Sequence, residues 1–188
     1  MIKIIAGKHK GRVIPTLKNA DYRPSTGRFR EALFSILTSG EFAENSTLEN
    51  AKVLDLFAGS GSLSFEALSR GAASATLVDI NEKYLKHAKA FAEKIGESEN
   101  VMCFKSNAIS LPYSGKKYDL VLMDPPYEKN FIPKVLKSLV KESWLEDKAI
   151  IVADMSKMDN FEMPANIVLV NERKYGNSKL MIMRYEQS

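Results

Sequence analysis

A tetrapeptide with the residue types needed to hold an amino group stands at residues 124–127, where the sequence reads Asp-Pro-Pro-Tyr. It directly follows the apolar run 118–123, which we expect to be a buried strand. Asp124 and the Pro125 carbonyl can accept hydrogen bonds from a planar amine, such as the exocyclic amine of a nucleobase, and Tyr127 can stack on its ring. The prolines fix the loop, because each locks φ at about −65°. The alternative is an ordinary strand ended by a Pro-Pro turn.

A glycine-containing loop precedes a predicted helix nearer the middle of the chain. Residues 55–61, Asp-Leu-Phe-Ala-Gly-Ser-Gly, end an apolar strand, and the two glycines let the backbone turn tightly and let a ligand approach it. Ligands of open α/β sheets bind at the carboxyl ends of the strands. Asp79 follows the next strand, and an acid there can accept hydrogen bonds from both ribose hydroxyls of an adenosine. The loop and this acid together indicate an adenosine cofactor.

The chemistry of this loop favours a cationic cofactor over a dinucleotide. Ser64 stands where the third glycine of a dinucleotide fingerprint would be, and Asp55 places negative charge where a polyphosphate would bind. S-adenosylmethionine carries an ammonium, a sulfonium and no phosphate, so it suits the loop. The sequence has no P-loop motif, which excludes a P-loop nucleotide hydrolase. Asp55 and Asp79 can instead be ordinary helix or turn caps, and Asn107, after the third strand, either bonds the adenine edge or is a simple turn residue.

The composition limits the class of protein. A chain of 188 residues with 45% hydrophobic residues fits one domain, or one domain with a small appendage. No apolar run approaches 18 residues and the N-terminus has no long apolar region, so we expect neither a membrane span nor a secretory signal. Cys103 is the only cysteine, which excludes an internal disulfide and suits a reducing cytosol. One cysteine and two histidines argue against a zinc site.

Positive charge is concentrated at the N-terminus. Residues 1–30 carry eight Lys and Arg residues against one acid, a net charge of +7, so the rest of the chain carries −3 when the whole carries +4. A basic segment on an acidic body is typical of a protein that contacts phosphate backbones. The segment also contains apolar residues, so we expect an ordered element and not a solvated tail. The basic residues expected at nucleic acid are Lys8, Lys10, Arg12, Arg23, Arg28 and Arg30; as an alternative, Arg30 pairs with acids on its own helix.

The order of predicted elements indicates an α/β fold behind a small extension. A short hairpin over 2–6 and 12–14 and a helix that begins after residue 26 form the extension, and a polar connection spans 40–50. Strands are predicted at 52–57, 75–78, 101–104, 119–123, 149–153, 167–173 and 179–185, with helices at 62–69, 82–95 and 132–140. Alternating strands and helices predict a parallel sheet with helices on both faces, and the terminal pair adds an antiparallel strand.

With these residues assembled, the chain resembles the class I S-adenosylmethionine-dependent methyltransferases. More narrowly it resembles the RsmD family, small bacterial enzymes that methylate the N2 amine of a guanine in 16S ribosomal RNA. The matching segments are 4–8 with 11–12, 23–34, 53–61, 66–72, 124–127 and 175–176. The Arg-Pro-Ser-Thr segment at 23–26 joined to Asp-Pro-Pro-Tyr is specific, whereas the glycine loop alone is not. Two residues depart from the family: Asn107 stands where an acid is common, and Asp79 where many relatives have Glu.

The resemblance implies a fold, a reaction and a set of partners. The fold is a Rossmann-like α/β methyltransferase domain at 41–188, with a mostly parallel seven-stranded sheet and an antiparallel C-terminal strand, behind an RNA-contacting extension at 1–40. The reaction moves a methyl group from S-adenosylmethionine, which becomes S-adenosylhomocysteine, to guanine N2 without a metal. The partner is 16S ribosomal RNA or a small-subunit particle, and the enzyme is a cytoplasmic monomer.

The resemblance also implies roles for particular residues. Four residues would be catalytic: Asp124, Pro125, Pro126 and Tyr127. The cofactor would be bound by Asp55, Phe57, Ala58, Gly59, Ser60, Gly61, Asp79, Ile80, Asn107, Ala108 and Asp124. Thr26 would bind RNA with the basic residues named above, and Arg23 and Thr26 would also contact the cofactor side of the pocket. Apart from the resemblance, Tyr175 is either a second wall of the site or a core aromatic, and we expect it in the core.

Three other functions remain open at this point. A DNA methyltransferase acting on adenine or cytosine amines would use the same Asp-Pro-Pro-Tyr chemistry, but the chain has no segment large enough for a separate DNA-reading domain. A nicotinamide-dependent oxidoreductase would need a third glycine in the loop. A non-catalytic RNA-binding assembly factor would have no use for an intact Asp-Pro-Pro-Tyr.

Overall fold

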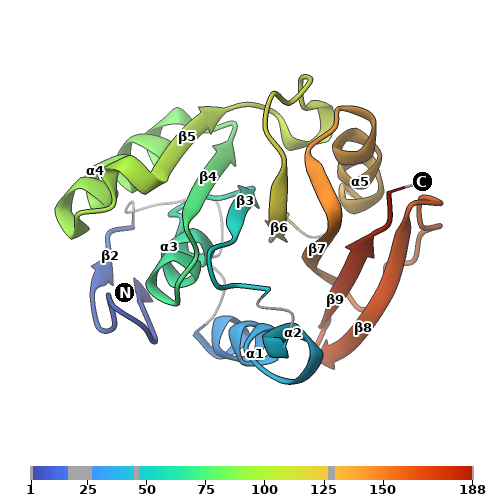
Figure 1. The fold of residues 1–188 in the computed structure, drawn as a ribbon, viewed down its shortest axis with the longest axis horizontal. Coiled ribbons are helices and arrows are strands. Elements are labelled where there is room, and N and C mark those ends of the chain that lie inside the picture. The colour runs from blue at the N-terminus through green and yellow to red at the C-terminus, as the bar shows by residue number, and fades with distance from the viewer. Residues whose placement is uncertain (1, 17–26, 45–46, 127–129, 188) are drawn as a thin grey trace.

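A seven-stranded sheet forms the centre of the molecule (Figure 1). The structure, a computed structural model, describes residues 2–16, 27–44, 47–126 and 130–187. The strands are β3 (Lys52–Leu56), β4 (Ser74–Asp79), β5 (Val101–Lys105), β6 (Tyr118–Met123), β7 (Leu145–Ser156), β8 (Ile167–Tyr175) and β9 (Ser178–Tyr185), in the order β5-β4-β3-β6-β7-β9-β8. All neighbours are parallel except β9, which is antiparallel to both β7 and β8. The predicted fold class is confirmed.

Two apolar layers cover the two faces of the sheet. One layer includes residues of α1 (Gly27–Leu37), α3 (Ser62–Ser69) and α4 (Glu82–Ile95). The other includes residues of η2 (Ala108–Ser110) and α5 (Ile132–Lys141). Both faces of the central strands are therefore buried, which explains why these strands read as continuous apolar runs.

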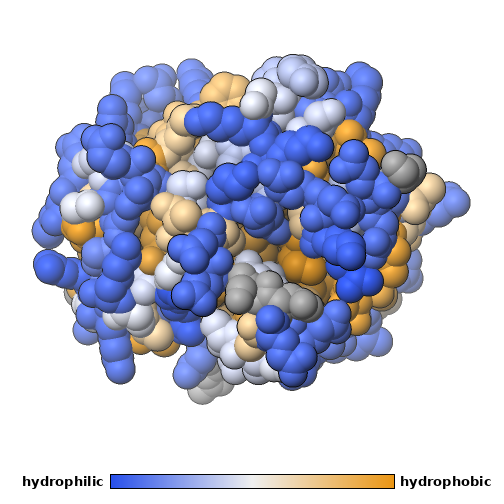
Figure 2. Space-filling view, viewed as in Figure 1, coloured by the Kyte–Doolittle hydropathy of each residue, from blue (hydrophilic) through white to orange (hydrophobic). Residues whose placement is uncertain are grey.

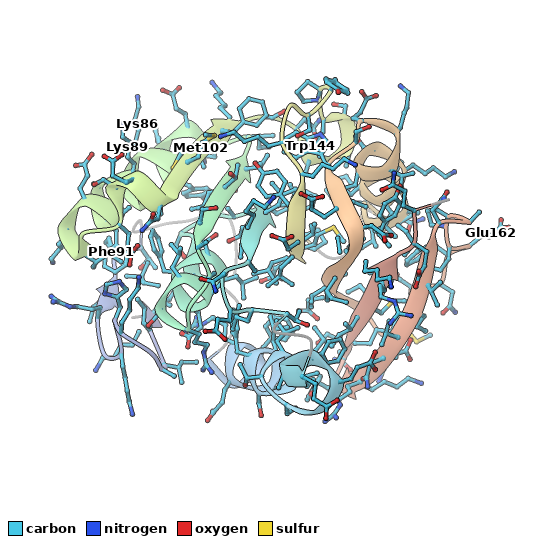
Figure 3. The ribbon with its side chains drawn as sticks, in the orientation of Figure 1. Lys86, Lys89, Phe91, Met102, Trp144 and Glu162 are labelled. Carbon is cyan, nitrogen blue, oxygen red and sulfur yellow. The ribbon has the colours of Figure 1, made fainter. Side chains whose placement is uncertain are left out.

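The helix α4 shows how sequence pattern sets orientation. The Asn81 side chain caps it by accepting a hydrogen bond from the Lys83 amide, and Gly96 ends it in the left-handed conformation. Phe91 is buried and packs edge-on against a ring of α3, whereas Lys86 and Lys89 lie on the exposed side (Figure 3). This amphipathic pattern fixes which side of α4 meets the sheet.

The N-terminal segment packs on the same layer as α3. It forms the two-stranded hairpin β1 (Ile2–Lys3) and β2 (Val13–Ile14), which lies beside α3 and α4 (Figure 1). Its apolar side chains share one buried cluster with residues of α1, α3 and β3. The division of the chain at residue 40 stays a prediction, and the apolar cluster runs across that boundary.

Three segments differ from the prediction. The polar connection at 40–50 contains the short helix α2 (Gly40–Glu44), which forms because it buries Phe42. The strand β7 begins four residues early, because Leu145 is buried and pairs with Tyr118 before a register shift. The hairpin strands are shorter than expected, with two residues each.

The surface of the molecule is mainly hydrophilic on the face shown in Figure 2. Hydrophilic residues cover most of the face seen in Figure 2, and hydrophobic residues show mainly between them. Within the described ranges, no helix has the length and apolar character needed to cross a membrane.

Candidate active site

Predicted cofactor and catalytic residues in the described part of the chain, those after β3 and β6, begin side by side at one edge of the sheet. The strands β3 and β6 are parallel neighbours, with Leu56 opposite Met123 in the register. The glycine loop that follows β3 and the Asp124 loop that follows β6 therefore begin side by side, since adjacent strands lie about 4.8 Å apart. This is the edge at which ligands bind in open parallel sheets.

The glycine loop contains three residues with positive φ, two of which are glycines. Gly59 and Gly61 have φ of 52° and 73°, and Phe57 has φ of 63°, which is rare for an aromatic residue. A Cβ on Gly61 would lie 2.6 Å from the Leu77 side chain and 2.8 Å from that of Phe65, so only glycine fits there. The Phe57 ring stacks on Phe131 at a centroid distance of 5.7 Å, which ties the glycine loop to the start of α5.

Asp55 is a buried acid at the start of the glycine loop, and it binds the first turn of α3. It is 2% exposed, and its Oδ2 accepts hydrogen bonds from the Ser64 amide at 3.2 Å and from the Ser64 hydroxyl at 2.7 Å. Burial raises the pKa of Asp55 to about 7, against the effect of these two hydrogen bonds. Ser64, which counts against a dinucleotide, is thus the partner that holds the Asp55 carboxyl in place.

Asp79 joins the loop to the second strand. Its Oδ2 accepts a hydrogen bond from the Gly59 amide at 2.9 Å, and its Oδ1 accepts one from the Asn81 amide at 2.8 Å. Each carboxylate oxygen keeps a second lone pair. The carboxylate can therefore accept hydrogen bonds from two ribose hydroxyls while it fixes the loop.

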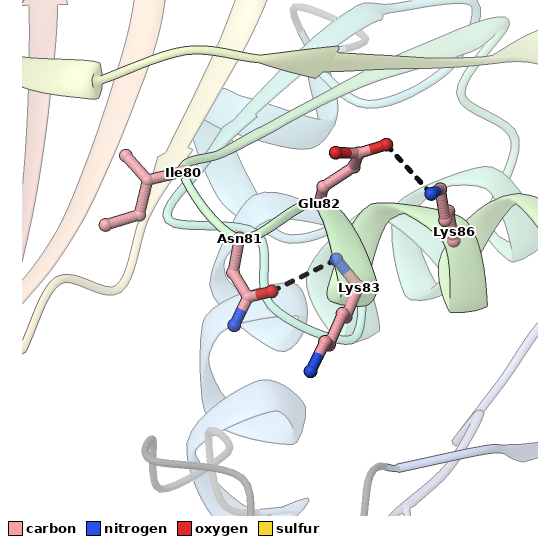
Figure 4. Close-up of a pocket in the computed structure, with 5 residues that line it drawn as sticks. All are labelled: Ile80, Asn81, Glu82, Lys83 and Lys86. Carbon is pink, nitrogen blue, oxygen red and sulfur yellow. Dashed lines mark hydrogen bonds and ion pairs between the residues drawn. The ribbon is translucent and has the colours of Figure 1, made fainter.

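A shallow depression adjoins Asp79. Ile80, next to Asp79, is 68% exposed and offers an apolar wall to a flat ring. The Asn107 Oδ1 caps η2 by accepting a hydrogen bond from the Ile109 amide, so its role as a turn residue is confirmed. Its contact with adenine stays a prediction and would use the amide nitrogen. The residues that line the depression are Ile80, Asn81, Glu82, Lys83 and Lys86 (Figure 4).

Asp124 lies in an acidic and poorly solvated place. Burial, together with the nearby carboxylates of Asp154 and Asp55, raises the pKa of Asp124 to about 7. Pro125 is buried and Pro126 is exposed, so the loop has one anchored and one accessible proline. The carboxyl group can thus change its protonation state near neutral pH, which suits a group that handles protons.

The basic residues expected at nucleic acid have different surroundings. Lys10 and Arg12 are exposed, whereas the Lys8 ammonium pairs with Glu97 at 2.7 Å. Arg30 is 3% exposed and donates a hydrogen bond to the Lys3 carbonyl at 2.9 Å. Its prediction as a direct RNA contact is wrong, because a guanidinium buried between α1 and the hairpin cannot reach a phosphate.

Buried acids hold the hairpin against the catalytic fold. Glu66 in α3 is fully buried and accepts hydrogen bonds from the Ile5 and Ala6 amides at 2.7 and 3.1 Å. Arg70, one turn along, pairs with the same carboxylate at 2.8 Å. Glu66 therefore satisfies hairpin amides that would otherwise be buried without a partner.

Glu97, just after α4, is a second anchor for the hairpin. Its Oε1 lies 2.5 Å from His9 Nε2 and 2.7 Å from Lys8 Nζ, and its Oε2 accepts a hydrogen bond from the Asn100 side chain. Burial alone would raise the pKa of Glu97, but the hydrogen bonds from Asn100, His9 and Lys8 lower it to about 2. The ionised carboxylate is therefore part of the folded state.

We expect the ionised Glu97 to make the free energy of unfolding depend on pH. A pKa lowered from 4.5 to about 2 stabilises the fold above pH 4.5 by roughly 3 kcal/mol, and this stabilisation is lost as the pH falls towards 2. Glu97→Gln should lower the free energy of unfolding at pH 7, and the deficit should shrink between pH 4.5 and 2. Urea unfolding at several pH values tests this, with Glu99→Gln on the exposed side of the same turn as control. A deficit that does not change with pH would contradict the assignment.

Comparison with known proteins identifies the family. The sequence profile of the family described as "Conserved hypothetical protein 95" matches residues 2–184. The chain belongs to this family. The predicted resemblance to the RsmD family is confirmed, because the chain is 34% identical to "Ribosomal RNA small subunit methyltransferase D" of Escherichia coli, over 93% of this chain and 85% of that protein.

Two further relatives agree with this family. A protein of Rickettsia prowazekii described as "Uncharacterized methylase RP545" is 42% identical over 98% of each chain. The solved structure "Putative methyltransferase yhhF" from Escherichia coli has a TM-score of 0.85 and 32% identity, over 98% of each chain. The chain is therefore a methyltransferase of this family with the fold described above.

The structure of this family member does not describe every predicted site residue. Arg23, Thr26, Tyr127 and the side chain of Arg28 lie outside the described residues.

Three residues of the site and its supports are not predicted from the sequence: Glu66, Glu97 and Asp154. Only Asp154 carries a signal in the sequence, because it ends an apolar run as Asp124 does. Tyr175, predicted in the core, is 37% exposed near the β8–β9 turn, so that prediction is wrong. Within the described ranges, no group of three or more His, Cys, Asp or Glu side chains could hold a metal ion.

Proposed function

We propose that the protein transfers a methyl group from S-adenosylmethionine to the exocyclic N2 amine of a guanine in 16S ribosomal RNA of the small subunit. The observation that supports this most is the position of Asp124 and Pro125 beside the glycine loop, across the β3–β6 pair. An acceptor for an amine thus stands next to a loop suited to adenosine. The relatives named as small-subunit rRNA methyltransferases supply the substrate class.

The donor groups at the edge of the sheet suit S-adenosylmethionine. Asp55, Asp79 and Asp124 follow or end three adjacent strands, and residues 55–61 contain no Lys or Arg. Such a site repels a polyphosphate and suits a ligand with two positive charges. The cofactor would be held at its ribose by Asp79, at its adenine by Ile80 and Asn107, and along the backbone of the glycine loop. When bound, it supplies an electrophilic methyl group on sulfur.

The protein itself positions the amine and stabilises the positive charge that develops on its nitrogen. An exocyclic amine is a poor nucleophile, because its lone pair is delocalised into the base. The Asp124 carboxylate and the Pro125 carbonyl accept hydrogen bonds from the two N–H groups of the amine, which turns its lone pair towards the methyl group. The Asp124 carboxylate also stabilises the positive charge that develops on nitrogen. The target guanine must be unpaired or flipped out of a helix to reach this loop.

A labelling experiment tests the reaction and the substrate together. Labelled S-adenosylmethionine is incubated with naked 16S RNA, with small-subunit particles that lack the modification, and with duplex DNA, and the nucleosides are analysed by mass spectrometry. N2-methylguanosine in RNA is expected. Methylated adenine or cytosine in DNA would leave the fold assignment intact and would contradict the proposed RNA substrate. No transfer to any of these substrates would favour the role of a non-catalytic RNA-binding factor.

The exposed hairpin predicts a measurable salt dependence of RNA binding. Lys10→Ala with Arg12→Ala removes two positive charges at the exposed turn and should reduce the slope of log affinity against log salt by about 1.5, because each phosphate contact contributes 0.7–0.9. Lys134→Ala with Lys137→Ala removes the same charge from α5, on the other face of the sheet, and should leave the slope unchanged. Equal slopes for the two double variants would show that the hairpin does not contact RNA.

A further inference from the structure

A buried carboxylate, that of Asp154, stands next to the half-buried Asp124 near the end of the neighbouring strand. The strands β6 and β7 are parallel, with Leu122 opposite Val152 and Met123 opposite Ala153 in the register. The next residues along the two strands are Asp124 and Asp154. Side chains alternate between the faces of a sheet, so both carboxylates lie on the face of Leu122 and Val152, whose apolar cluster also contains residues of α1, α3 and α4.

The surroundings of Asp154 differ from those of an ordinary surface acid. Asp154 is 6% exposed, although β7 continues to Ser156 towards the edge where the catalytic loop lies. Its partner on β9 is the apolar Leu180. Asp124 is half-buried and Asp154 is buried. Two such neighbouring carboxyl groups repel each other when both are ionised, and such pairs hold protons more tightly than isolated carboxylates do.

We propose that Asp154 is a positioning residue that acts through Asp124, and that its charge makes the Asp124 carboxylate the acceptor of the proton released when the guanine amine is methylated. This rests on the proposed function. In the step, the N–CH3 bond forms from the nitrogen lone pair as the S–CH3 bond breaks, and its electron pair stays on sulfur. The amine proton then passes to an oxygen of Asp124, and from there to solvent. A carboxylate without such a neighbour is a weak base at neutral pH and would take this proton less readily.

The described strands and helix around this pair carry several charged groups that bear on it. Asp55 on β3 adds a third carboxylate, and both Asp55 and Asp154 act in the same direction on the pKa of Asp124, which they raise. From α3, the uncharged Ser64 faces Asp55, while Glu66 and Arg70 pair with each other. On β9, Lys179 next to Leu180 faces the other side of the sheet and pairs with Glu172.

The test is the pH dependence of single-turnover methyl transfer to the RNA substrate in the whole protein. Asp154→Asn keeps the shape of the side chain and removes its charge. The acidic limb of the rate profile should move about one unit to lower pH, because Asp124 then ionises more easily, and the plateau at high pH should fall several-fold, because it is a weaker base. The substrate KM should stay within two-fold. Asp154→Glu keeps the charge and should keep the wild-type limb.

Matched controls separate this role from a structural one. Asp147→Asn removes an exposed acid at the other end of β7 and should leave the profile unchanged. An Asp154→Asn profile that is lower at every pH, with its limb unmoved, would show a structural role and overturn the proposal.

A second measurement keeps the proposal independent of the substrate. The Asp124 carboxyl can be titrated by carbon NMR in protein with labelled aspartate and no ligand, and assigned with Asp124→Asn. Its midpoint should fall in Asp154→Asn, and an unchanged midpoint would overturn the coupling. If the wild-type protein methylates no guanine at all, the proposed function fails on its own, and this titration still decides whether the two carboxyl groups are coupled.

Discussion

Asp124→Ala should reduce methyl transfer by at least about 10³-fold while S-adenosylmethionine binding stays within a few-fold. The carboxylate is the only charged acceptor in the Asp-Pro-Pro-Tyr segment, and it lies beside the glycine loop through the Leu56–Met123 register. Its loss removes both the hydrogen bond that orients the amine and the charge that stabilises the developing cation. The cofactor contacts of Asp79 and of the glycine loop are made by other groups, so cofactor binding should survive.

The measurement for Asp124→Ala is single-turnover transfer together with calorimetric titration of the cofactor. Asp119→Ala is the matched control, since Asp119 lies at the other end of the same strand and accepts a hydrogen bond from the Lys52 amide. It should lose some stability and keep the rate. If Asp124→Ala retains a near-normal rate, the amine-positioning mechanism is wrong. If it loses cofactor binding in proportion to the rate, Asp124 acts on the cofactor and not on the amine.

The parts of the fold that local sequence controls were predictable. The helices Ser62–Ser69 and Glu82–Ile95 agree with the prediction residue for residue. For the second, Asn81 at the start and Gly96 at the end satisfy some of the backbone groups that every helix leaves open. The position of Asp124 beside the glycine loop was also predictable, because both follow apolar strands of a parallel sheet and such ends meet at one edge.

The parts that depend on contacts distant in sequence were not predictable. Glu66 binds amides about 60 residues away and Glu97 binds a side chain 88 residues away, and no local pattern marks either acid as buried. The sequence predicts Arg30 at RNA because charge usually indicates exposure, but Arg30 is buried and bonds a hairpin carbonyl. Asp154 becomes a neighbour of Asp124 only once the order of β6 and β7 is known.

Gly7→Ala should detach the hairpin from α3 and destabilise the protein by roughly 3–5 kcal/mol. Gly7 has φ of 81°, and a Cβ there would lie 1.7 Å from the backbone oxygen of Ser69. Because backbone cannot yield as a flexible side chain does, the hairpin must move away. It would then lose the hydrogen bonds from the Lys8 amide to the Ser69 carbonyl at 2.8 Å and from the His9 amide to the Ser69 hydroxyl at 2.9 Å.

Gly11→Ala provides the matched control, because the two glycines share a backbone conformation and differ in their surroundings. Gly11 has φ of 83°, but nothing lies within 4 Å of a Cβ at that position. It should cost only the strain of a left-handed alanine, about 1–2 kcal/mol. Urea unfolding gives the two losses, and amide hydrogen exchange at Lys8 and His9 shows whether the hairpin is released. Equal losses for the two variants would mean that strain alone matters, and that close packing against Ser69 does not hold the hairpin in place.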